Sequence, residues 1–340
     1  MSLDEKIYSL FIVTPEQLLD NNTLDGDYLT RENPELIASL EQKPVSGVIL
    51  FGGNIKYPYQ TKELTNVFAA RGMFVAVDEE GGKVARIGNN NSFPVPVFSA
   101  ADECPDPYNM YKTISSYLRY YGFNLDFAPV ADISVDDGGV IGSRAFASDP
   151  ELVSQAVYDS VSGFIDSCML CSLKHFPGHG ATTADSHNGA AILDKTREEL
   201  EEWEFLPFIN GIKAGASVIM LGHIIVPEIT ENLPATLSEP MIDILRNDFN
   251  FDGLVITDSF RMKAITDSFS AGEAALMALK AGVDIVLMPD NLNKAYDAVK
   301  KAVTSGELSE EAINKKLFRI INLKYSYGII PLETFETSDN

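Results

Sequence analysis

Short apolar runs alternate along this chain with longer amphipathic stretches. Eight such runs occur, and most are apolar at every position rather than at every second one. This pattern is typical of parallel strands, which are covered on both faces of a sheet. We therefore expect strands at residues 8–14, 47–52, 74–78, 125–130, 168–176, 217–224, 254–259 and 284–289.

Helical stretches with their own start and stop signals lie between these runs. Thr196 with Glu199, and Ser270 with Glu273, have the spacing of a capping box at a helix N-terminus. Glycine often ends a helix because it adopts the left-handed backbone conformation at little cost. Glycines of this kind stand shortly before three of the expected strands, at Gly72, Gly215 and Gly282.

Strands that alternate with helices over most of the chain predict an α/β fold, a TIM-like (β/α)8 barrel. An open doubly wound sheet is the alternative. No polar linker or low-complexity segment divides the sequence. We therefore expect a single domain over residues 1–330 and a disordered tail at residues 331–340.

A barrel of this kind carries its active site at the carboxyl ends of the strands. In this sequence those ends carry polar residues that are capable of chemistry. That agreement favours an enzyme more strongly than any single motif does. In chain order the strand-end residues are Asp78, Asp132, Lys174 with His175, His223, and Asp258.

Three of the four histidines lie in one glycine-rich stretch, KHFPGHGATTADSHNG, between Lys174 and Gly189. Structural histidines would be scattered, so this grouping favours a chemical role. Asp185 and His187 are two residues apart, which allows the carboxylate to hold one imidazole nitrogen and raise the imidazole pKa. The other nitrogen would then exchange protons near neutral pH. A pair of solvated loop residues is the alternative interpretation.

A metal site is a competing interpretation of the same stretch. Pro177 argues against a helix in HFPGH, so its two histidines would not share a helix face, and Lys174 would oppose a cation. We therefore expect no metal and no other cofactor. The ligands of such a site would be His175, His179, Asp185 and His187.

Composition narrows the classes of partner. The chain has 49 acidic and 26 basic residues and a net charge of −23, which disfavours nucleic acid or an anionic membrane surface. A small neutral substrate is easier to reconcile with this charge.

The N-terminus lacks a signal-peptide pattern, and no run reaches transmembrane length. Three cysteines cannot all pair, and Cys168 and Cys171 lie within an apolar run, so we expect structural thiols in a cytoplasmic protein.

Four motifs occur in order between Gly47 and Pro289: VDEEGGKVARI, GSRAFASDP, KHFPGHG followed by DSH, and ITDSFRM. Together they resemble the single-domain bacterial β-N-acetylglucosaminidases of glycoside hydrolase family 3. The resemblance implies a barrel without the second domain of the family's β-glucosidases. It also implies retaining hydrolysis of terminal, non-reducing β-linked N-acetylglucosamine, taken from peptidoglycan fragments during recycling or from chitooligosaccharides.

The resemblance assigns roles to individual residues. Asp258 matches the nucleophile, and His187, paired with Asp185, matches an unusual acid/base. Double displacement needs a nucleophile below the anomeric carbon and a proton donor beside the leaving oxygen, which these two would supply. The positions that bind the sugar are matched by Asp78, Arg86, Arg144, Lys174 and His175, to which we add His223 from its place at a strand end.

Several alternatives stay open. An imidazole acid/base leaves no second carboxylate facing the glycosyl-enzyme, so a phosphorylase is one alternative. A β-glucosidase or xylosidase of the same family, a non-catalytic sugar-binding barrel and a metal-dependent hydrolase are others. Departures from the family pattern at NGAAILD, SFRM and Gly52–Gly53 leave the natural aglycone and the sugar preference open. The oligomeric state is also open, a monomer included.

Overall fold

The computed structural model describes residues 1–19, 28–135, 140–182 and 191–331. At its centre, seven parallel strands pair in chain order, and an eighth, β12, pairs with the first. A single bridge between Ile256 and Ile285 joins β11 to the segment before β12, so the sheet curves round into a barrel. The barrel strands are β1 (Phe11–Val13), β2 (Gly47–Ile49), β3 (Phe74–Val77), β6 (Leu125–Asp126), β7 (Leu170–Phe176), β9 (Val218–Leu221), β11 (Leu254–Thr257) and β12 (Val286–Leu287).

The eight strands confirm the eight predicted runs, although each strand is shorter than its run. Every residue in them is buried, which explains why the runs are apolar at successive positions. The first run differs most from its prediction, because Tyr8 belongs to helix α1 (Leu3–Tyr8) and not to a strand. Ser2 and Glu5 form a capping box that starts this helix.

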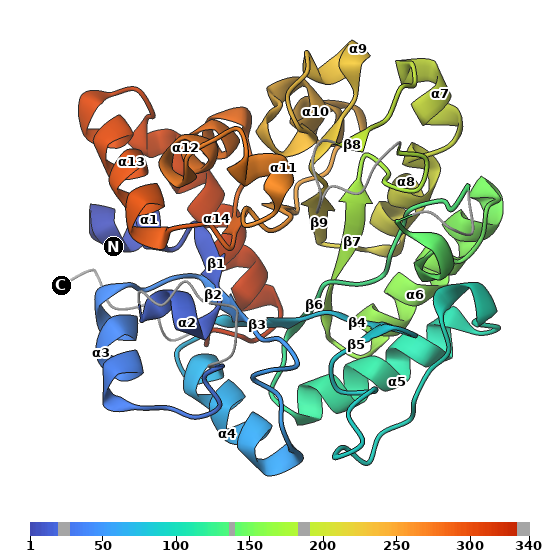
Figure 1. The fold of residues 1–340 in the computed structure, drawn as a ribbon, viewed down its shortest axis with the longest axis horizontal. Coiled ribbons are helices and arrows are strands. Elements are labelled where there is room, and N and C mark those ends of the chain that lie inside the picture. Colours follow the sequence, from blue (N-terminus) through green and yellow to red (C-terminus); the bar gives the residue numbers. More distant parts are fainter. Residues whose placement is uncertain (20–27, 136–139, 183–190, 332–340) are drawn as a thin grey trace.

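Helices surround the strands on all sides (Figure 1). Thr196 and Glu199 form the predicted capping box, and Gly215 and Gly282 end their helices in the left-handed conformation. The helices after α1 are α2 (Pro15–Leu18), α3 (Pro34–Gln42), α4 (Pro58–Ala69), α5 (Pro107–Tyr120), α6 (Pro150–Asp166), α7 (Arg197–Glu202), α8 (Phe205–Ala214), α9 (Pro227–Thr230), α10 (Glu239–Asp243), α11 (Lys263–Thr266), α12 (Ala271–Ala281), α13 (Leu292–Ser305) and α14 (Glu310–Ser326).

Short elements extend beyond the carboxyl ends of the barrel strands. An antiparallel hairpin follows β3, and its turn is possible because Gly81 and Gly82 have φ values of 89° and 55°. The hairpin strands are β4 (Glu79–Gly81) and β5 (Val84–Ala85), while β8 (Ala191–Ile192) pairs with β10 (Ile224–Ile225). The helical turns are η1 (Ala101–Glu103), η2 (Gly142–Arg144), η3 (Ala235–Leu237) and the π-helical η4 (Ile244–Asp248).

One large hydrophobic core joins the strands to their covering helices, as expected of one domain. Cys171 is buried in it, Cys168 is exposed, and neither forms a disulfide. In the described part of the chain, no helix combines the length and the apolar character that crossing a membrane requires.

Candidate active site

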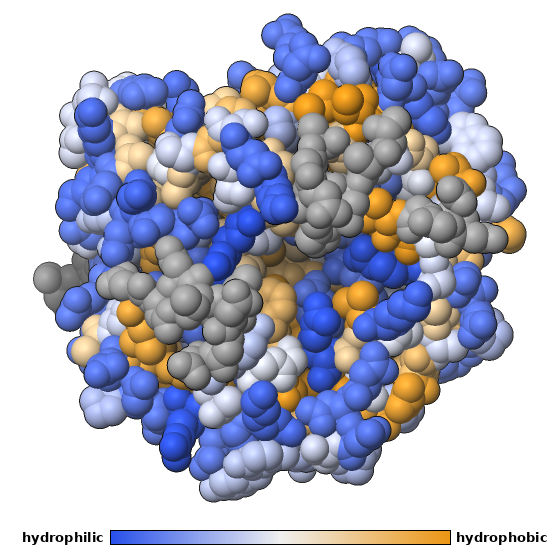
Figure 2. Space-filling view, in the orientation of Figure 1, coloured by the Kyte–Doolittle hydropathy of each residue, from blue (hydrophilic) through white to orange (hydrophobic). Residues whose placement is uncertain are grey.

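Residues at the carboxyl ends of the barrel strands converge on a pocket of about 380 Å³. Asp78 follows β3, Lys174 and His175 lie near the end of β7, and Asp258 follows β11. All four line the pocket, as the strand-end argument predicted. Figure 2 shows this face of the molecule, which is hollowed near its centre and carries hydrophilic residues around the hollow.

Lys174 is the centre of a buried charge cluster. Its Nζ lies 3.0 Å from Asp78 Oδ1 and 2.5 Å from Glu80 Oε1, and its side chain is 3% exposed. Burial alone would lower the pKa of Lys174, but the two carboxylates raise it above the usual lysine value. Lys174 is therefore a fixed cation that orients polar groups rather than a group that exchanges protons.

Arg144 reaches the same cluster from η2. Its Nε and Nη2 donate to the two oxygens of Glu80 at 2.9 and 2.8 Å, a bidentate pair. Burial acts to raise the pKa of Glu80, but the charges of Lys174 and Arg144 hold it far below the usual range. Glu80 was not among the residues predicted from the sequence to bind substrate. The signal was its spacing from Asp78, because residues two apart on an extended segment face the same side.

Arg86 lies beside Asp78 on the other side of the cluster. Its Nη2 is 3.6 Å from Asp78 Oδ2, and its guanidinium lies over the Phe51 ring at 5.9 Å. The Nε of Arg86 is buried without a hydrogen-bond partner among the described residues. A buried donor of this kind is costly unless something accepts from it, and Arg86 also lines the pocket.

His175 is oriented by Asp132. Asp132 Oδ2 lies 2.7 Å from His175 Nδ1, and Oδ1 accepts the backbone N–H groups of His175 and His179 at 3.1 and 2.7 Å. Burial acts to raise the pKa of Asp132, but the histidines and the N–H donors lower it overall, so the carboxylate is charged. A charged carboxylate can only accept, so His175 Nδ1 carries hydrogen and donates it to Asp132, which leaves Nε2 for the pocket. Asp132 itself is fully buried and therefore acts through His175.

Four described residues from the segment after β11 line the pocket, and Asp258 is the one carboxylate among them. Its Oδ1 accepts the backbone N–H of Ser259 at 2.7 Å. Burial acts to raise the pKa of Asp258, but the imidazole of His175, the Ser259 N–H and Lys174 lower it below the usual aspartate value. The group is thus held as a carboxylate, the form in which it can attack an electrophilic carbon.

His223 does not line the pocket, unlike the other described residues predicted to bind substrate. It is fully buried, and both ring nitrogens have partners inside the protein: Thr236 Oγ1 at 3.0 Å and the Ser259 carbonyl at 2.9 Å. Gly222 and His223 come after the end of β9, and the ring packs against Phe260. His223 therefore follows the end of its strand as predicted, but its side chain bonds inside the protein and does not face the pocket.

The remaining wall of the pocket was not anticipated. Three methionines line it, from β9, from the segment after β11 and from the end of β12. Arg261, three residues after Asp258, adds a further cation. Apolar walls with a few oriented polar groups are typical of small-molecule sites. The methionines are Met220, Met262 and Met288.

Asp185 and His187, the predicted acid/base pair, lie outside the described residues. Within the described ranges, no group of three or more His, Cys, Asp or Glu side chains is arranged to hold a metal ion. The two described histidines of the candidate metal set have protein partners, Asp132 for His175 and Thr182 for His179. In both, the nitrogen that is bonded is Nδ1.

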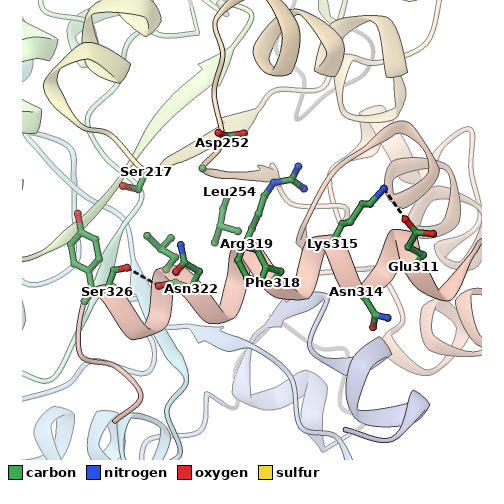
Figure 3. Close-up of a pocket in the computed structure, with 13 residues that line it drawn as sticks. Ser217, Asp252, Leu254, Glu311, Asn314, Lys315, Phe318, Arg319, Asn322 and Ser326 are labelled. Carbon is green, nitrogen blue, oxygen red and sulfur yellow. Dashed lines mark hydrogen bonds and ion pairs between the residues drawn. The ribbon is translucent and has the colours of Figure 1, made fainter. Parts of the chain in front are cut away.

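A larger cavity of about 770 Å³ lies at the opposite end of the barrel. It is lined by α14 together with Ser217, Asp252 and Gly253, which precede β9 and β11. Figure 3 shows Lys315 paired with Glu311 along α14. This pair is exposed on the surface of the helix, and the cavity lies at the amino ends of the strands, so size does not identify the active site.

Comparison with known proteins identifies relatives of this chain. The family described as "Glycosyl hydrolase family 3 N terminal domain" matches this chain over residues 2–323. A beta-hexosaminidase of Nitrosomonas eutropha is 34% identical over 270 residues, which are 75% of this chain and 78% of that protein. Beta-hexosaminidase A of Pseudoalteromonas piscicida is 30% identical over 333 residues, 87% of this chain and 56% of the relative.

A solved structure shows the same architecture. It is a glycoside hydrolase family 3 beta-N-acetylglucosaminidase from Paenibacillus sp. str. FPU-7, with 31% identity and a TM-score of 0.86. The match covers 100% of this chain and 66% of the Paenibacillus chain. This chain therefore spans just over half of the Pseudoalteromonas protein and about two thirds of the Paenibacillus one.

Proposed function

Because this chain belongs to glycosyl hydrolase family 3, we propose that it is a retaining exo-β-N-acetylglucosaminidase. It would remove terminal, non-reducing N-acetylglucosamine by double displacement through a glycosyl-enzyme. The relatives named beta-hexosaminidase and the Paenibacillus beta-N-acetylglucosaminidase support this substrate class. The fold, whose pocket lies at the carboxyl ends of the strands, is compatible with it.

One observation carries the proposal: Asp258, held as a carboxylate, lines the same pocket as the polar cluster around Lys174. A sugar ring needs many hydrogen bonds on its hydroxyl side and a free nucleophile below its anomeric carbon. Asp78, Arg86 and Lys174 would bind the hydroxyls, and Arg144 would hold Glu80 in place. His175, oriented by Asp132, would add a donor or acceptor through Nε2.

The proton donor in this proposal comes from the sequence. His187 would protonate the leaving oxygen and then activate water, while Asp185 would hold its other nitrogen. An imidazole loses a positive charge when it gives up its proton. It therefore leaves no anion beside the glycosyl-enzyme, unlike the carboxylate that most retaining glycosidases use.

The natural substrates in this proposal are peptidoglycan-derived fragments or chitooligosaccharides, and the place of action is the cytoplasm. All three cysteines are free, as in proteins of a reducing compartment. Paired assays on aryl β-N-acetylglucosaminide and aryl β-glucoside would test the sugar preference. A clear preference for the glucoside would favour the β-glucosidase alternative.

Trapping of the intermediate tests the nucleophile directly. A 5-fluoro glycosyl fluoride of N-acetylglucosamine should label the peptide that contains Asp258, and Asp258→Ala should lose nearly all turnover while keeping its melting temperature. The first product should keep the β configuration. A label on another residue, or an α product, would contradict the proposal.

Phosphate as the acceptor is a second candidate. Among the described residues that line the pocket, four side chains are cationic, Arg86, Arg144, Lys174 and Arg261, and three are carboxylates, although the chain has a net charge of −23. A local excess of positive charge favours an anion. Product analysis in millimolar phosphate decides: sugar 1-phosphate supports phosphorolysis, and free sugar alone leaves hydrolysis.

A further inference from the structure

A chain of buried hydrogen bonds lies behind Asp258, outside the pocket. His223 and Thr236 are both fully buried, and they come from different segments: the end of β9 and the η3 turn. His223 Nε2 lies 2.9 Å from the carbonyl oxygen of Ser259, and His223 Nδ1 lies 3.0 Å from Thr236 Oγ1. No substrate can reach either nitrogen while these bonds are made.

The partners of His223 fix where its proton lies. A carbonyl oxygen can only accept, so Nε2 carries hydrogen and donates to Ser259. Burial lowers the pKa of His223, so the ring is neutral and Nδ1 is an acceptor. The hydroxyl of Thr236 must then donate to Nδ1. The direction of each bond in the chain from Thr236 through His223 to Ser259 is therefore determined.

Ser259 connects this chain to the nucleophile. Its N–H donates to Asp258 Oδ1 at 2.7 Å. Its carbonyl accepts from His223, and the N–H of the same peptide, on Phe260, donates to Leu287 of β12 at 3.0 Å. That peptide is thus held on both sides, and Ser259 cannot rotate without breaking a buried hydrogen bond.

We propose that His223 and Thr236 are positioning residues that set the direction of the Asp258 carboxylate through Ser259. The inference rests on the proposed function, because it assumes that Asp258 attacks the sugar. A nucleophile must approach its carbon within about 3.5 Å and in line, and a displacement of about 1 Å costs roughly a hundredfold in rate. Behind the nucleophile, where no ligand reaches, a hydrogen-bonded histidine is a means of preventing such a displacement.

Thr236→Val is the most direct test, because it keeps the shape of the side chain and removes only the hydroxyl. We expect kcat on an aryl β-N-acetylglucosaminide to fall about tenfold while KM changes less than about twofold, since alignment affects the reacting atoms more than binding. Thr236→Ser restores the hydroxyl and should restore kcat. Labelling of Asp258 by the 5-fluoro sugar should slow in Thr236→Val by the same factor as kcat.

Thr230→Val is the matched control. Thr230 is also buried and lies in the same connection between β10 and α10, and among the described residues its hydroxyl bonds the backbone of Val226 alone. It should lose stability as Thr236→Val does while keeping wild-type kcat. Equal kcat values in the two valine variants would overturn the inference.

A second pair of variants decides the matter if Thr236→Val does not fold. His223→Gln can still donate to the Ser259 carbonyl through its amide, whereas His223→Met has a similar size and no donor. We expect the methionine variant to be the slower, and equal rates would overturn the inference. Failure of the wild-type protein to label at Asp258 would instead contradict the proposed function, so the two failures are distinguishable.

Discussion

Two neighbouring glutamates on one hairpin strand have opposite surroundings. Glu80 faces the pocket, where Lys174 and Arg144 neutralise it with two positive charges. Glu79 faces the other way and is fully buried. The groups that donate to it are neutral, among them the backbone N–H groups of Ile87 and Gly88 at 2.9 and 2.7 Å and the hydroxyl of Tyr117 at 2.8 Å.

The difference shows how one short segment can both build a site and hold itself in place. Successive side chains of an extended strand point to opposite sides, so Glu80 points into the pocket and Glu79 points away from it. Glu80 holds the cations in their places around the site. Glu79 holds the turn directly after Arg86, and therefore the segment that carries this guanidinium towards Asp78.

The largest effect is expected when the pocket-facing glutamate loses its charge. Glu80→Gln leaves Arg144 and Lys174 buried with less compensation, and breaking such a pair typically costs about 3 kcal/mol. It also puts an amide N–H₂ against one of the two cations. We expect kcat/KM to fall about a hundredfold, because the groups that hold the sugar would shift. Chemical denaturation and steady-state kinetics would measure the two losses.

An intact rate in Glu80→Gln would show that the cations keep their positions without the carboxylate. Glu79→Gln is the matched control for this test, because it makes the same chemical change one residue away. Glu79 lies outside the pocket, so the control should bind substrate through the same groups, with at most the disturbance that reaches Arg86 through Ile87 and Gly88.

The pKa values of the two glutamates are shifted in opposite directions, which predicts a second, smaller difference in how stability depends on pH. The pKa of Glu80 is lowered, so its contribution to the free energy of unfolding is present above the usual glutamate pKa of 4.5 and is lost as pH falls below it. Burial raises the pKa of Glu79 above 4.5, despite its hydrogen bonds. Its contribution is therefore present below pH 4.5 and is lost as pH rises through the folded-state pKa.

Stability measured from acid to neutral pH should show these signs. The advantage of the wild-type protein over Glu80→Gln should grow with rising pH, and its advantage over Glu79→Gln should shrink, by about 1.4 kcal/mol for each unit of pKa shift. Two differences that run in the same direction would mean that both glutamates have charged surroundings.

The sequence predicted the barrel and the strand-end residues because both depend on local patterns. Runs that are apolar at successive positions marked the strands, and the first charged residue at the end of a run marked Asp78 and Asp258. It could not distinguish Glu79 from Glu80, because which of two alternating side chains faces the pocket depends on how the hairpin lies over the barrel. The identity of the two residues carries no such information.

Pairings between distant segments were equally out of reach. Asp132 and His175 are 43 residues apart, and only the parallel arrangement of β6 and β7 brings the segments that carry them together. His223 was placed at the correct strand end, yet its partner Thr236 comes from a turn that no pattern connected with it. The sequence shows the types and positions of all four residues. The direction of each side chain was set by tertiary packing.

The smallest expected effect is a difference in stability between two variants of α5, in which a tyrosine that bonds one of the two glutamates loses its hydroxyl. Tyr117 donates to the carboxylate of Glu79 at 2.8 Å, whereas Tyr111 donates to the backbone carbonyl of Glu80 at 3.0 Å. Both rings are buried, so Tyr117→Phe and Tyr111→Phe each remove one buried hydroxyl from the same helix. A hydrogen bond to a charged group contributes about 2 kcal/mol, and one to a neutral carbonyl about 1 kcal/mol.

At neutral pH Tyr117→Phe should therefore cost more stability than Tyr111→Phe, and the difference should disappear in acid once Glu79 takes up a proton. Denaturant titrations at both pH values would measure it, and an equal loss from both variants at neutral pH would mean that Glu79 is uncharged in the folded protein.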